Sequence, residues 1–501
     1  MTVYPIIVHS VCFALSSLWC NSLGNDVWNR SEQSVAANCV LYTFVYFLAV
    51  QACVSFVACG RTLLRTKRLL NFPRDWTMAH EKIMRRLLGF NDKRQAIWNA
   101  VFELFGILLI FVLFDRTTFL LKKQRVHSPL QFTALCACAL FAAACTVRKV
   151  TPKPPINSSR MLPREQTEEW KGWMQLVFLW YHYFNVREVY TIVRVCIASY
   201  IWLTGFGNFR YFYTTNDLSL RRLARILWRI NFFPICLCLT LRNQWMLYYI
   251  CALHSVFTVL VYLTLVVYRS GNTRSLWVGL KIACAAGGAF VIWDILPRKD
   301  FDALWLPLKA VLQFQHRHGP HQDDPMYEWY FRSKLDHFIW IWGMAIAFLL
   351  PGVERYMAWL GGARRRSIPC VVLLLSTMAS YWWRYLHLRT IEYNSYHPFV
   401  SVVAVLSYVA LRNLFPCLRQ HYLALFQRVG TLTLECYLAQ MHIWMGTSGP
   451  NGSAQYTLQI CPQWMPQSLN FPLFSVFHFV CAYRIFRLTE ILKDCLIPRD
   501  K

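Results

Sequence analysis

The chain has 501 residues, of which 56% are hydrophobic and 15% are charged. A soluble protein of this size carries roughly 25% charged residues, so the composition excludes an ordinary soluble domain. The formal net charge of +27 would suit a nucleic-acid-binding protein in a soluble chain. Here the basic residues stand between apolar runs, where they orient helices and face anionic membrane lipid, and no nucleic-acid partner is predicted.

Apolar runs recur from end to end, and their length matches what a bilayer of about 30 Å demands of a helix. About fourteen runs are recognisable by the hydropathy criterion. They cover residues 3–20, 36–59, 97–114, 130–147, 173–186, 189–205, 226–241, 245–268, 276–297, 337–352, 369–388, 397–411, 429–446 and 470–487. Several are short, 173–186 and 397–411 especially. The sequence therefore predicts an all-α, polytopic integral membrane protein with about 10–14 transmembrane helices.

The placement of lysine and arginine predicts the orientation. With the N-terminus in the cytosol, alternating spans put Arg364-Arg365-Arg366 and most other arginines on the cytosolic side, together with the C-terminus. The uncharged loop 447–469, with the glycosylation sequon Asn451-Gly452-Ser453, then lies in the lumen. One loop disagrees, because Lys122, Lys123 and Arg125 would be lumenal although they are basic.

The proline-rich segment 151–163 cannot be helical throughout. It separates N-terminal transmembrane helices (1–150) from a polar-rich multispan domain (151–501). The 19 cysteines lie mostly inside apolar runs, which is typical of helix packing. The loop 298–336 holds His316, His318 and His321, but without zinc-type ligand spacing no metal site is predicted.

Polar residues gather at the predicted lumenal face. His182 lies near the lumenal end of its span, as His442 does, and His397 begins a span at the same face. Glu435 stands seven residues before His442, which predicts one helix face and a separation of about 10 Å. Asp336 ends a ladder with Glu328 and Arg332 at four-residue spacing. A histidine near a carboxylate in a shielded site is a suitable general base for a hydroxyl group.

The predicted cytosolic face has a different character. Lys171 opens its span there, with Gln175 on the same helical stripe. The segment Gly205–Arg210 ends the next span, and Arg221, Arg222, Arg225 and Arg229 follow, with Asn231 just inside the following span. Glycines that free the backbone and arginine donors suit a polyphosphate such as a nucleotide or coenzyme A.

Each of these features also has a plainer interpretation. The arginines satisfy the positive-inside rule, the ladder stabilises a helix, and a lone membrane histidine such as His254 hydrogen-bonds a neighbour. A phosphate site on one face and a base on the other favour acyl transfer across the membrane. A proton-coupled transporter ranks second, and a structural scaffold ranks third.

Ordered blocks of the sequence resemble the Cas-type membrane O-acetyltransferases, a family that includes plant wall-acetylation, fungal capsule O-acetylation and sialate O-acetyltransferase proteins. The plant proteins look closest. The blocks include Thr167–Gln175, Tyr181–Phe184, Arg194, Thr204–Phe209, Trp228–Phe232, Tyr248–Ile250, Glu328–Trp329, Leu335–Asp336, Tyr396–Pro398, Leu411–Asn413, Leu432–Glu435 and His442–Trp444. They cover roughly residues 95–500. Met441 departs from the family pattern, which usually has an aromatic residue before the matched histidine.

The resemblance implies acetyl transfer from cytosolic acetyl-CoA to hydroxyls of a lumenal glycan or nucleotide sugar in the membrane of the Golgi or the endoplasmic reticulum. The serine-hydrolase-like domain of some members has no counterpart motif here, so a separate lumenal serine-type O-acetyltransferase is a possible partner, and a transporter of the acetyl donor is the alternative. His442 and His182 are expected to handle the acetyl group or act as bases, with Glu435 and Asp336 to orient or tune them. His397 is a further expected catalytic residue. The expected acetyl-CoA-binding residues are Lys171, Trp173, Gln175, Arg194, Gly205, Gly207, Asn208, Arg229 and Asn231.

Overall fold

The computed structural model describes residues 92–150, 161–316, 321–461 and 467–498. The predicted spans 3–20 and 36–59 and the residue His318 lie outside these ranges. Eight of the described helical segments are long and apolar enough to cross a membrane. The predicted class, a helical polytopic membrane protein, is confirmed.

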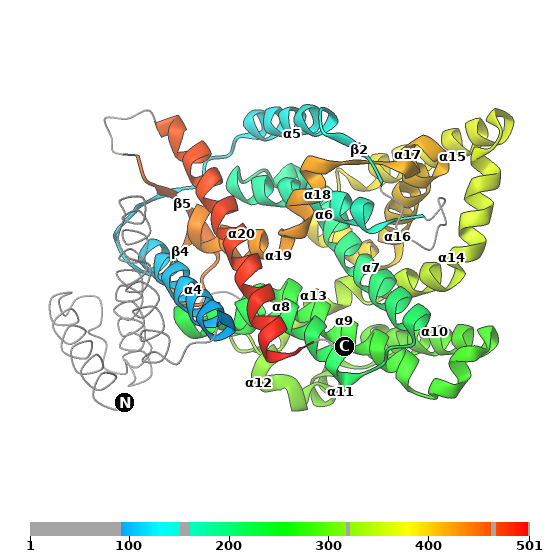
Figure 1. Cartoon of the computed structure of the whole chain (residues 1–501), viewed down its shortest axis with the longest axis horizontal. Helices are drawn as coiled ribbons and strands as arrows, with labels where there is room; N and C mark the ends of the chain where they lie inside the picture. The colour runs from blue at the N-terminus through cyan, green and yellow to red at the C-terminus, as the bar shows by residue number, and fades with distance from the viewer. Residues whose placement is uncertain (1–91, 151–160, 317–320, 462–466, 499–501) are drawn as a thin grey trace, which may run out of the picture.

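The membrane-length helices are longer than most of the predicted runs. They are α4 (Asp92–Arg116), α7 (Tyr190–Thr215), α8 (Leu220–Leu241), α9 (Tyr249–Val266), α10 (Ser275–Phe290), α14 (Ile339–Gly361), α16 (Thr390–Leu414) and α20 (Asn470–Leu496). Helix α20 runs diagonally across the view of Figure 1 and packs on both α4 and α8. The turns η2 (Arg187–Val189) and η3 (Trp245–Tyr248) lead into α7 and α9, and the π-turn η5 (Val291–Ile295) extends α10.

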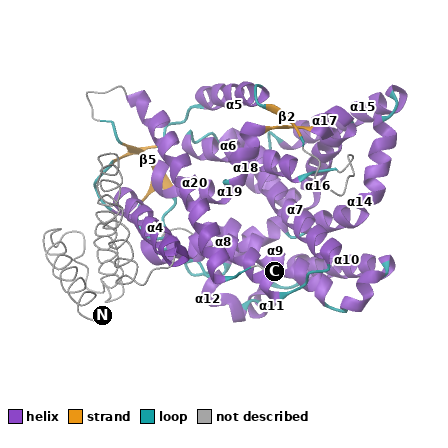
Figure 2. Ribbon diagram, in the orientation of Figure 1, coloured by secondary structure: helices purple, strands orange, loops and turns teal. Residues whose placement is uncertain are grey.

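Shorter helices and small sheets complete the fold (Figure 2). The helices are α5 (Pro129–Ala144), α6 (Arg164–Tyr183), α11 (Arg298–Leu304), α12 (Lys309–Leu312), α13 (Tyr327–Asp336), α15 (Arg364–Tyr385), α17 (Pro416–Gln420), α18 (Ala424–Thr431) and α19 (Thr433–Ala439). Strands β1 (Leu121–Gln124), β5 (Ala454–Gln459) and β4 (Met445–Thr447) form one antiparallel sheet, and β2 (Val147–Lys149) pairs with β3 (His421–Leu423).

The predicted span 173–186 belongs to α6, which is not among the eight membrane-length apolar helices of the described chain. Its polar residues are buried against protein, because α6 packs closely along α18. The close approach of α6 and α18 depends on two glycines. A Cβ added to Gly172 would lie 1.8 Å from the Phe426 carbonyl oxygen, and one added to Gly430 would lie 1.7 Å from the Glu168 carbonyl oxygen.

The predicted span 429–446 is divided in the structure. Helix α18 ends at Thr431, α19 begins at Thr433, and the π-turn η7 (Gln440–Trp444) leads directly into β4. Threonine and glycine are weak helix formers, and Thr433 Oγ1 donates to the Gly430 carbonyl oxygen at the break. The division changes which neighbours the polar residues of this segment meet.

The buried side chains form two apolar clusters. One is built mainly from α7, α9, α10 and α14 and includes Trp202 and Trp293. The other joins α4, α6, α8, α19, η7 and α20 around Phe111, Phe233 and Trp444. The second cluster matters for the site, because it surrounds the polar residues at the end of α4 and in η7.

Candidate active site

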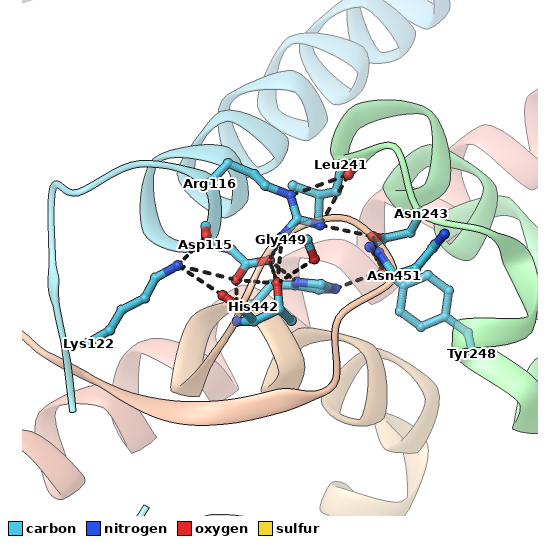
Figure 3. Close-up of polar contacts among 10 residues, drawn as sticks. Asp115, Arg116, Lys122, Leu241, Asn243, Tyr248, His442, Gly449 and Asn451 are labelled. Atoms are coloured by element: carbon cyan, nitrogen blue, oxygen red, sulfur yellow. Dashed lines mark hydrogen bonds and ion pairs between the residues drawn. The ribbon is translucent and has the colours of Figure 1, made fainter. Parts of the chain in front are cut away.

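A closed ring of hydrogen bonds joins residues that are far apart in the sequence (Figure 3). Asp115 and Arg116 end α4, Asn243 follows α8, Tyr248 ends η3, and His442 lies in η7. His442 Nδ1 is 2.8 Å from Asp115 Oδ2, and His442 Nε2 is 2.8 Å from the Tyr248 hydroxyl. Asn243 Nδ2 donates to the same hydroxyl at 3.0 Å. The Asp115 and Tyr248 side chains therefore hold the imidazole from both sides.

The Asp115 carboxylate is buried but well compensated. Arg116 Nη1 donates to it at 2.7 Å, and the backbone N–H of Thr447 donates at 2.6 Å. The ammonium group of Lys122 lies 4.0 Å from its Oδ1 and donates to the Thr447 carbonyl oxygen. A carboxylate with several donors and two nearby cations stays ionised, so Asp115 acts as an acceptor. Burial lowers the pKa of Lys122, and the nearby Asp115 carboxylate opposes that shift.

The donors of the ring fix the protonation of His442. Asn243 Oδ1 accepts from Arg116 Nη2 and from the Asn451 backbone N–H, both of which can only donate. The Asn243 amide nitrogen must then face Tyr248, whose hydroxyl proton is left for His442 Nε2. Because the Asp115 carboxylate can only accept, Nδ1 of the neutral imidazole carries the proton. His442 therefore presents an unprotonated Nε2 to the Tyr248 hydroxyl.

A cavity of about 990 Å³ lies between α6, α7, α8, α9 and the α18–α19 segment. One face of α6 contributes Lys171, Gln175 and Phe178, and one face of α9 contributes Ile250 and His254. We call the part of the cavity lined by exposed residues its outer end. The part lined by the buried Phe178, Ile250 and Tyr437 is its inner end. The inner end is close to the ring, since Ile250 is two residues after Tyr248 and Tyr437 five before His442.

Several cations line the cavity. Its more exposed part has Lys149, Arg164 and Arg210 beside the carboxylate Glu165, and the buried Arg419 also lines the cavity. Arg419 is buried, and its Nε and Nη1 atoms have no hydrogen-bond partner within the described part of the chain. Buried guanidinium nitrogens without partners cost stability unless a ligand or water supplies an acceptor. This part of the cavity is suited to bind an anion such as a phosphate group.

The structure divides the residues expected to bind acetyl-CoA. Five of them line the cavity, namely Lys171, Gln175, Gly207, Asn208 and Arg229. The other four do not line the cavity and contact other parts of the protein. Trp173 donates to the Tyr408 hydroxyl at 3.2 Å, and Asn231 donates to Ser255 Oγ at 2.7 Å.

Gly205 and Arg194 also differ from the expectation. The sequence predicted that glycines free the backbone of Gly205–Arg210 for contact with a phosphate. This prediction is wrong, because α7 continues as a regular helix to Thr215. Gly205 instead allows α14 to approach, since an added Cβ would lie 1.9 Å from the Trp340 carbonyl oxygen. Arg194 is buried and pairs with Asp336 at 2.5 Å.

Glu435 and His442 have different partners, although a continuous helix predicted one face. Glu435 forms an ion pair of 2.6 Å with Arg229, a cavity-lining residue, whereas His442 pairs with Asp115. The π-turn η7 between them changes the rotation per residue, so heptad spacing no longer aligns the side chains. Glu435 is therefore joined through Arg229 to the wall of the cavity and is not part of the His442 ring.

Asp336 and His397 form a separate buried cluster. His397 Nε2 lies 3.5 Å from Asp336 Oδ1, and its Nδ1 lies 2.9 Å from the Tyr393 hydroxyl. Asp336 thus contacts His397 and Arg194. The sequence had instead predicted that it orients His442 or His182. The predicted ladder on α13 is only half formed, because Arg332 bonds Glu328 at 2.9 Å.

His182 lies at the end of α6 and bonds to none of the ring residues. Its carbonyl oxygen accepts from Arg125 Nη1 at 2.8 Å, and its imidazole packs edge-on against Phe178 and Tyr181. In the loop 298–336, His316 lies 3.5 Å from Glu328 and His321 stacks on Tyr327.

The sequence analysis missed Asp115, Tyr248 and Asn243 as site residues. One signal was present, because the loop that violated the positive-inside rule contains Lys122. In the structure Lys122 donates to the Asp115 carbonyl oxygen at 2.5 Å. The basic loop therefore belongs to the site.

A buried acid–base pair beside an anion-receptive cavity, within a helical membrane protein, is the arrangement expected of a membrane acyltransferase. Residues 28–501 match the family described as the 10 TM acyl transferase domain found in Cas1p. The chain belongs to this family, which confirms the family resemblance indicated by its motifs. The closeness to the plant members stays a prediction.

A curated relative is the N-acetylneuraminate (7)9-O-acetyltransferase of Danio rerio. The two chains are 27% identical over 506 residues, and the alignment covers 97% of this chain and 61% of the relative. The chain thus spans less than two thirds of the relative's length. No solved structure matches the chain.

Proposed function

We propose that this protein transfers acetyl groups from cytosolic acetyl-CoA to hydroxyl groups of glycans on the lumenal side of the membrane. The observation that carries the proposal is the position of the Asp115–His442–Tyr248 ring next to the inner end of a cavity lined by several cations. The relative from Danio rerio, whose name describes the same type of reaction, supports it.

The cavity suits the acetyl donor in its chemistry. The phosphates of acetyl-CoA match the cations that line the cavity, among which Arg419 has guanidinium nitrogens without partners among the described residues. The inner end is lined by Phe178, Ile250 and Tyr437. Bound with its phosphates outward, the donor directs its thioester toward His442.

His442 supplies the base in this proposal. Its unprotonated Nε2 accepts the proton of an attacking hydroxyl group, and Asp115 stabilises the imidazolium that forms. Positioned acid–base catalysis of this kind contributes about 10²–10⁴-fold to a rate. His182, Asp336 and His397 take no part in this step, because each contacts other groups.

Arg332 is the residue we assign to the acceptor. Its guanidinium lies 4.3 Å from the centre of the Tyr249 ring, next in sequence to Tyr248. It also lies 5.2 Å from the centre of the Phe331 ring. Its terminal nitrogens form no hydrogen bond among the described residues. A cation surrounded by aromatic rings suits an acidic sugar such as N-acetylneuraminate, free or as a nucleotide sugar.

The same proposal places the protein in the Golgi or endoplasmic reticulum membrane with both termini in the cytosol. Lysine and arginine placement and the uncharged loop 447–469 support this orientation.

Reconstitution into liposomes tests the proposal. Labelled acetyl-CoA is added on the side that contains the basic cavity, and a sialylated glycan is enclosed on the other side. We expect label on the glycan hydroxyls with the natural protein. His442→Ala should abolish this label, whereas His387→Ala, which changes an exposed histidine on another part of the surface, should not.

Other outcomes distinguish the alternatives. Intact acetyl-CoA inside the vesicle, without labelled glycan, indicates a transporter of the donor. Full glycan acetylation by His442→Ala, at normal protein abundance, contradicts the assignment of His442 as the base.

A further inference from the structure

The hydroxyl group of Tyr248 occupies the position that a nucleophile takes in a hydrolase triad. It lies 2.8 Å from His442 Nε2, and the other imidazole nitrogen lies 2.8 Å from the Asp115 carboxylate. In a serine hydrolase the same order of groups lets histidine remove the proton of the attacking hydroxyl. Here a tyrosine hydroxyl stands in place of the serine.

The hydrogen bonds around Tyr248 favour ionisation of its hydroxyl. His442 Nε2 is oriented to take the proton, and Asn243 Nδ2 donates to the same oxygen at 3.0 Å. That bond persists and strengthens when the oxygen becomes a phenolate. Arg116 Nη2 donates to Asn243 Oδ1 at 2.9 Å, which polarises the amide toward Tyr248. A tyrosine that only anchored His442 would not need this second donor.

Two buried residues shortly before His442 carry polar groups without partners among the described residues. The Tyr437 hydroxyl lines the cavity and is buried, and it has no hydrogen-bond partner among the described residues. Gln440, two residues before His442, is buried, and both polar atoms of its amide likewise have no partner there. Buried polar groups of this kind are usually satisfied by a ligand or water. A donor bound in the cavity with its thioester toward His442 can supply such partners.

We propose that Tyr248 carries the acetyl group as an O-acetyl ester during the reaction, which rests on the proposed acetyl transfer. In the first step the Tyr248 oxygen bonds to the thioester carbonyl carbon and the carbon–sulfur bond breaks. The phenolic proton passes to His442 Nε2 and from there to the departing coenzyme A thiolate. Tyrosine is among the side chains that form covalent intermediates when an adjacent base activates them.

The second step returns the enzyme to its first state. The acceptor hydroxyl attacks the acetyl-tyrosine carbonyl carbon, and its proton passes to His442 Nε2. The bond between the Tyr248 oxygen and the acetyl carbon breaks, and the proton moves to the phenolate. An aryl ester keeps the acetyl group activated, because a tyrosine phenolate, with an ordinary pKa of about 10, is a good leaving group. Donor and acceptor then need not occupy the site together.

Trapping the ester tests the inference. The full chain in lipid nanodiscs is mixed with labelled acetyl-CoA without acceptor, quenched in acid and digested. We expect label on the peptide that contains Tyr248, release of that label by hydroxylamine, and its transfer to glycan when acceptor is added before the quench. Tyr248→Phe should lose both the label and the glycan acetylation while it still binds acetyl-CoA.

Tyr262→Phe is the matched control. Tyr262 lies on α9, is also buried, and donates a single hydrogen bond to the Leu218 carbonyl oxygen. This variant should keep the label at Tyr248. Retained acetyl-CoA binding by Tyr248→Phe separates loss of the nucleophile from loss of the fold.

Three results overturn the inference. Label on another residue, such as His442, assigns the intermediate elsewhere. Glycan acetylation at the natural rate by Tyr248→Phe, or by the natural protein without a trapped ester at any time point, shows direct transfer and leaves the proposed function intact. Absence of both ester and glycan acetylation in a protein that binds acetyl-CoA rejects the proposed function as well.

Discussion

Asp115 Oδ2 and His442 Nδ1 lie 2.8 Å apart although the two residues are separated by 327 positions in the sequence. Both side chains are fully buried. One ends a membrane-length helix, and the other lies in a π-turn. The end of a helix and a π-turn thus bring this carboxylate and this imidazole together.

Asp115→Asn should lower acetyl transfer by about 10²–10⁴-fold. The amide can donate to the imidazole, so the tautomer with a free Nε2 loses its preference. Initial rates with saturating acetyl-CoA measure the effect, and donor binding should stay unchanged because Asp115 does not line the cavity. Asp323→Asn, at an exposed carboxylate, serves as the control. Equal rates for the two variants would contradict the role of Asp115.

Arg419→Gln should weaken acetyl-CoA binding by about 10–100-fold, since a hydrogen bond to a charged group contributes about 1.5–3 kcal/mol. The two guanidinium nitrogens without partners in the described residues are then lost as phosphate donors. Equilibrium binding at two salt concentrations measures the change, and the salt dependence should decrease. Arg365→Gln, at an exposed arginine, should leave the affinity unchanged. An unaltered affinity in Arg419→Gln would place the donor phosphates elsewhere.

Arg332→Gln should raise the KM for an acidic sugar acceptor by about tenfold or more, because it removes a charge-assisted hydrogen bond. The rate at saturating acceptor should change less. The methyl ester of the same sugar, which lacks the carboxylate, provides the control on the substrate side. The natural protein should distinguish acid from ester, and the variant should not. If both proteins distinguish them equally, Arg332 does not bind the carboxylate.

The sequence predicted the helical membrane class because that class depends on composition and run length alone. It also drew attention to His442, since burying a histidine in an apolar run costs free energy and such residues usually have a function. Asp115 was not identified, because charged residues are common at the ends of membrane spans. Tyr248 was not identified because tyrosine is common at membrane interfaces.

Tertiary contacts explain the remaining differences. Lys171 and Gln175 lie together on the cavity wall, since their four-residue spacing puts them on one face of α6, and Arg229 reaches the same cavity from α8. Arg194 was grouped with them, but its partner Asp336 comes from α13 and draws it into another cluster. The pairing of Glu435 with His442 failed at a π-turn, a local irregularity that hydrophobic periodicity does not reveal.

Gly172→Ala should destabilise the protein by about 1–3 kcal/mol, the usual cost of overpacking. The added Cβ meets a backbone carbonyl 1.8 Å away, so no side-chain rotation can relieve the clash between α6 and α18. Thermal unfolding in detergent measures the loss. Gly106→Ala is the control, because nothing lies within 4 Å of its added Cβ. In the interior of α4 it should stabilise the protein by about 0.5–1 kcal/mol.

Asn451→Ala should lower acetyl transfer about fivefold, the rate equivalent of one hydrogen bond of about 1 kcal/mol. Asn451 Oδ1 accepts from the Gln244 backbone N–H at 2.6 Å, which fixes the start of η3 and hence the position of Tyr248. Ser453→Ala removes the same glycosylation sequon but not this bond, so it should leave the rate unchanged. Both variants are assayed for transfer and for glycan by enzymatic deglycosylation. Equal losses in the two variants would mean that a glycan, and not the hydrogen bond, supports activity.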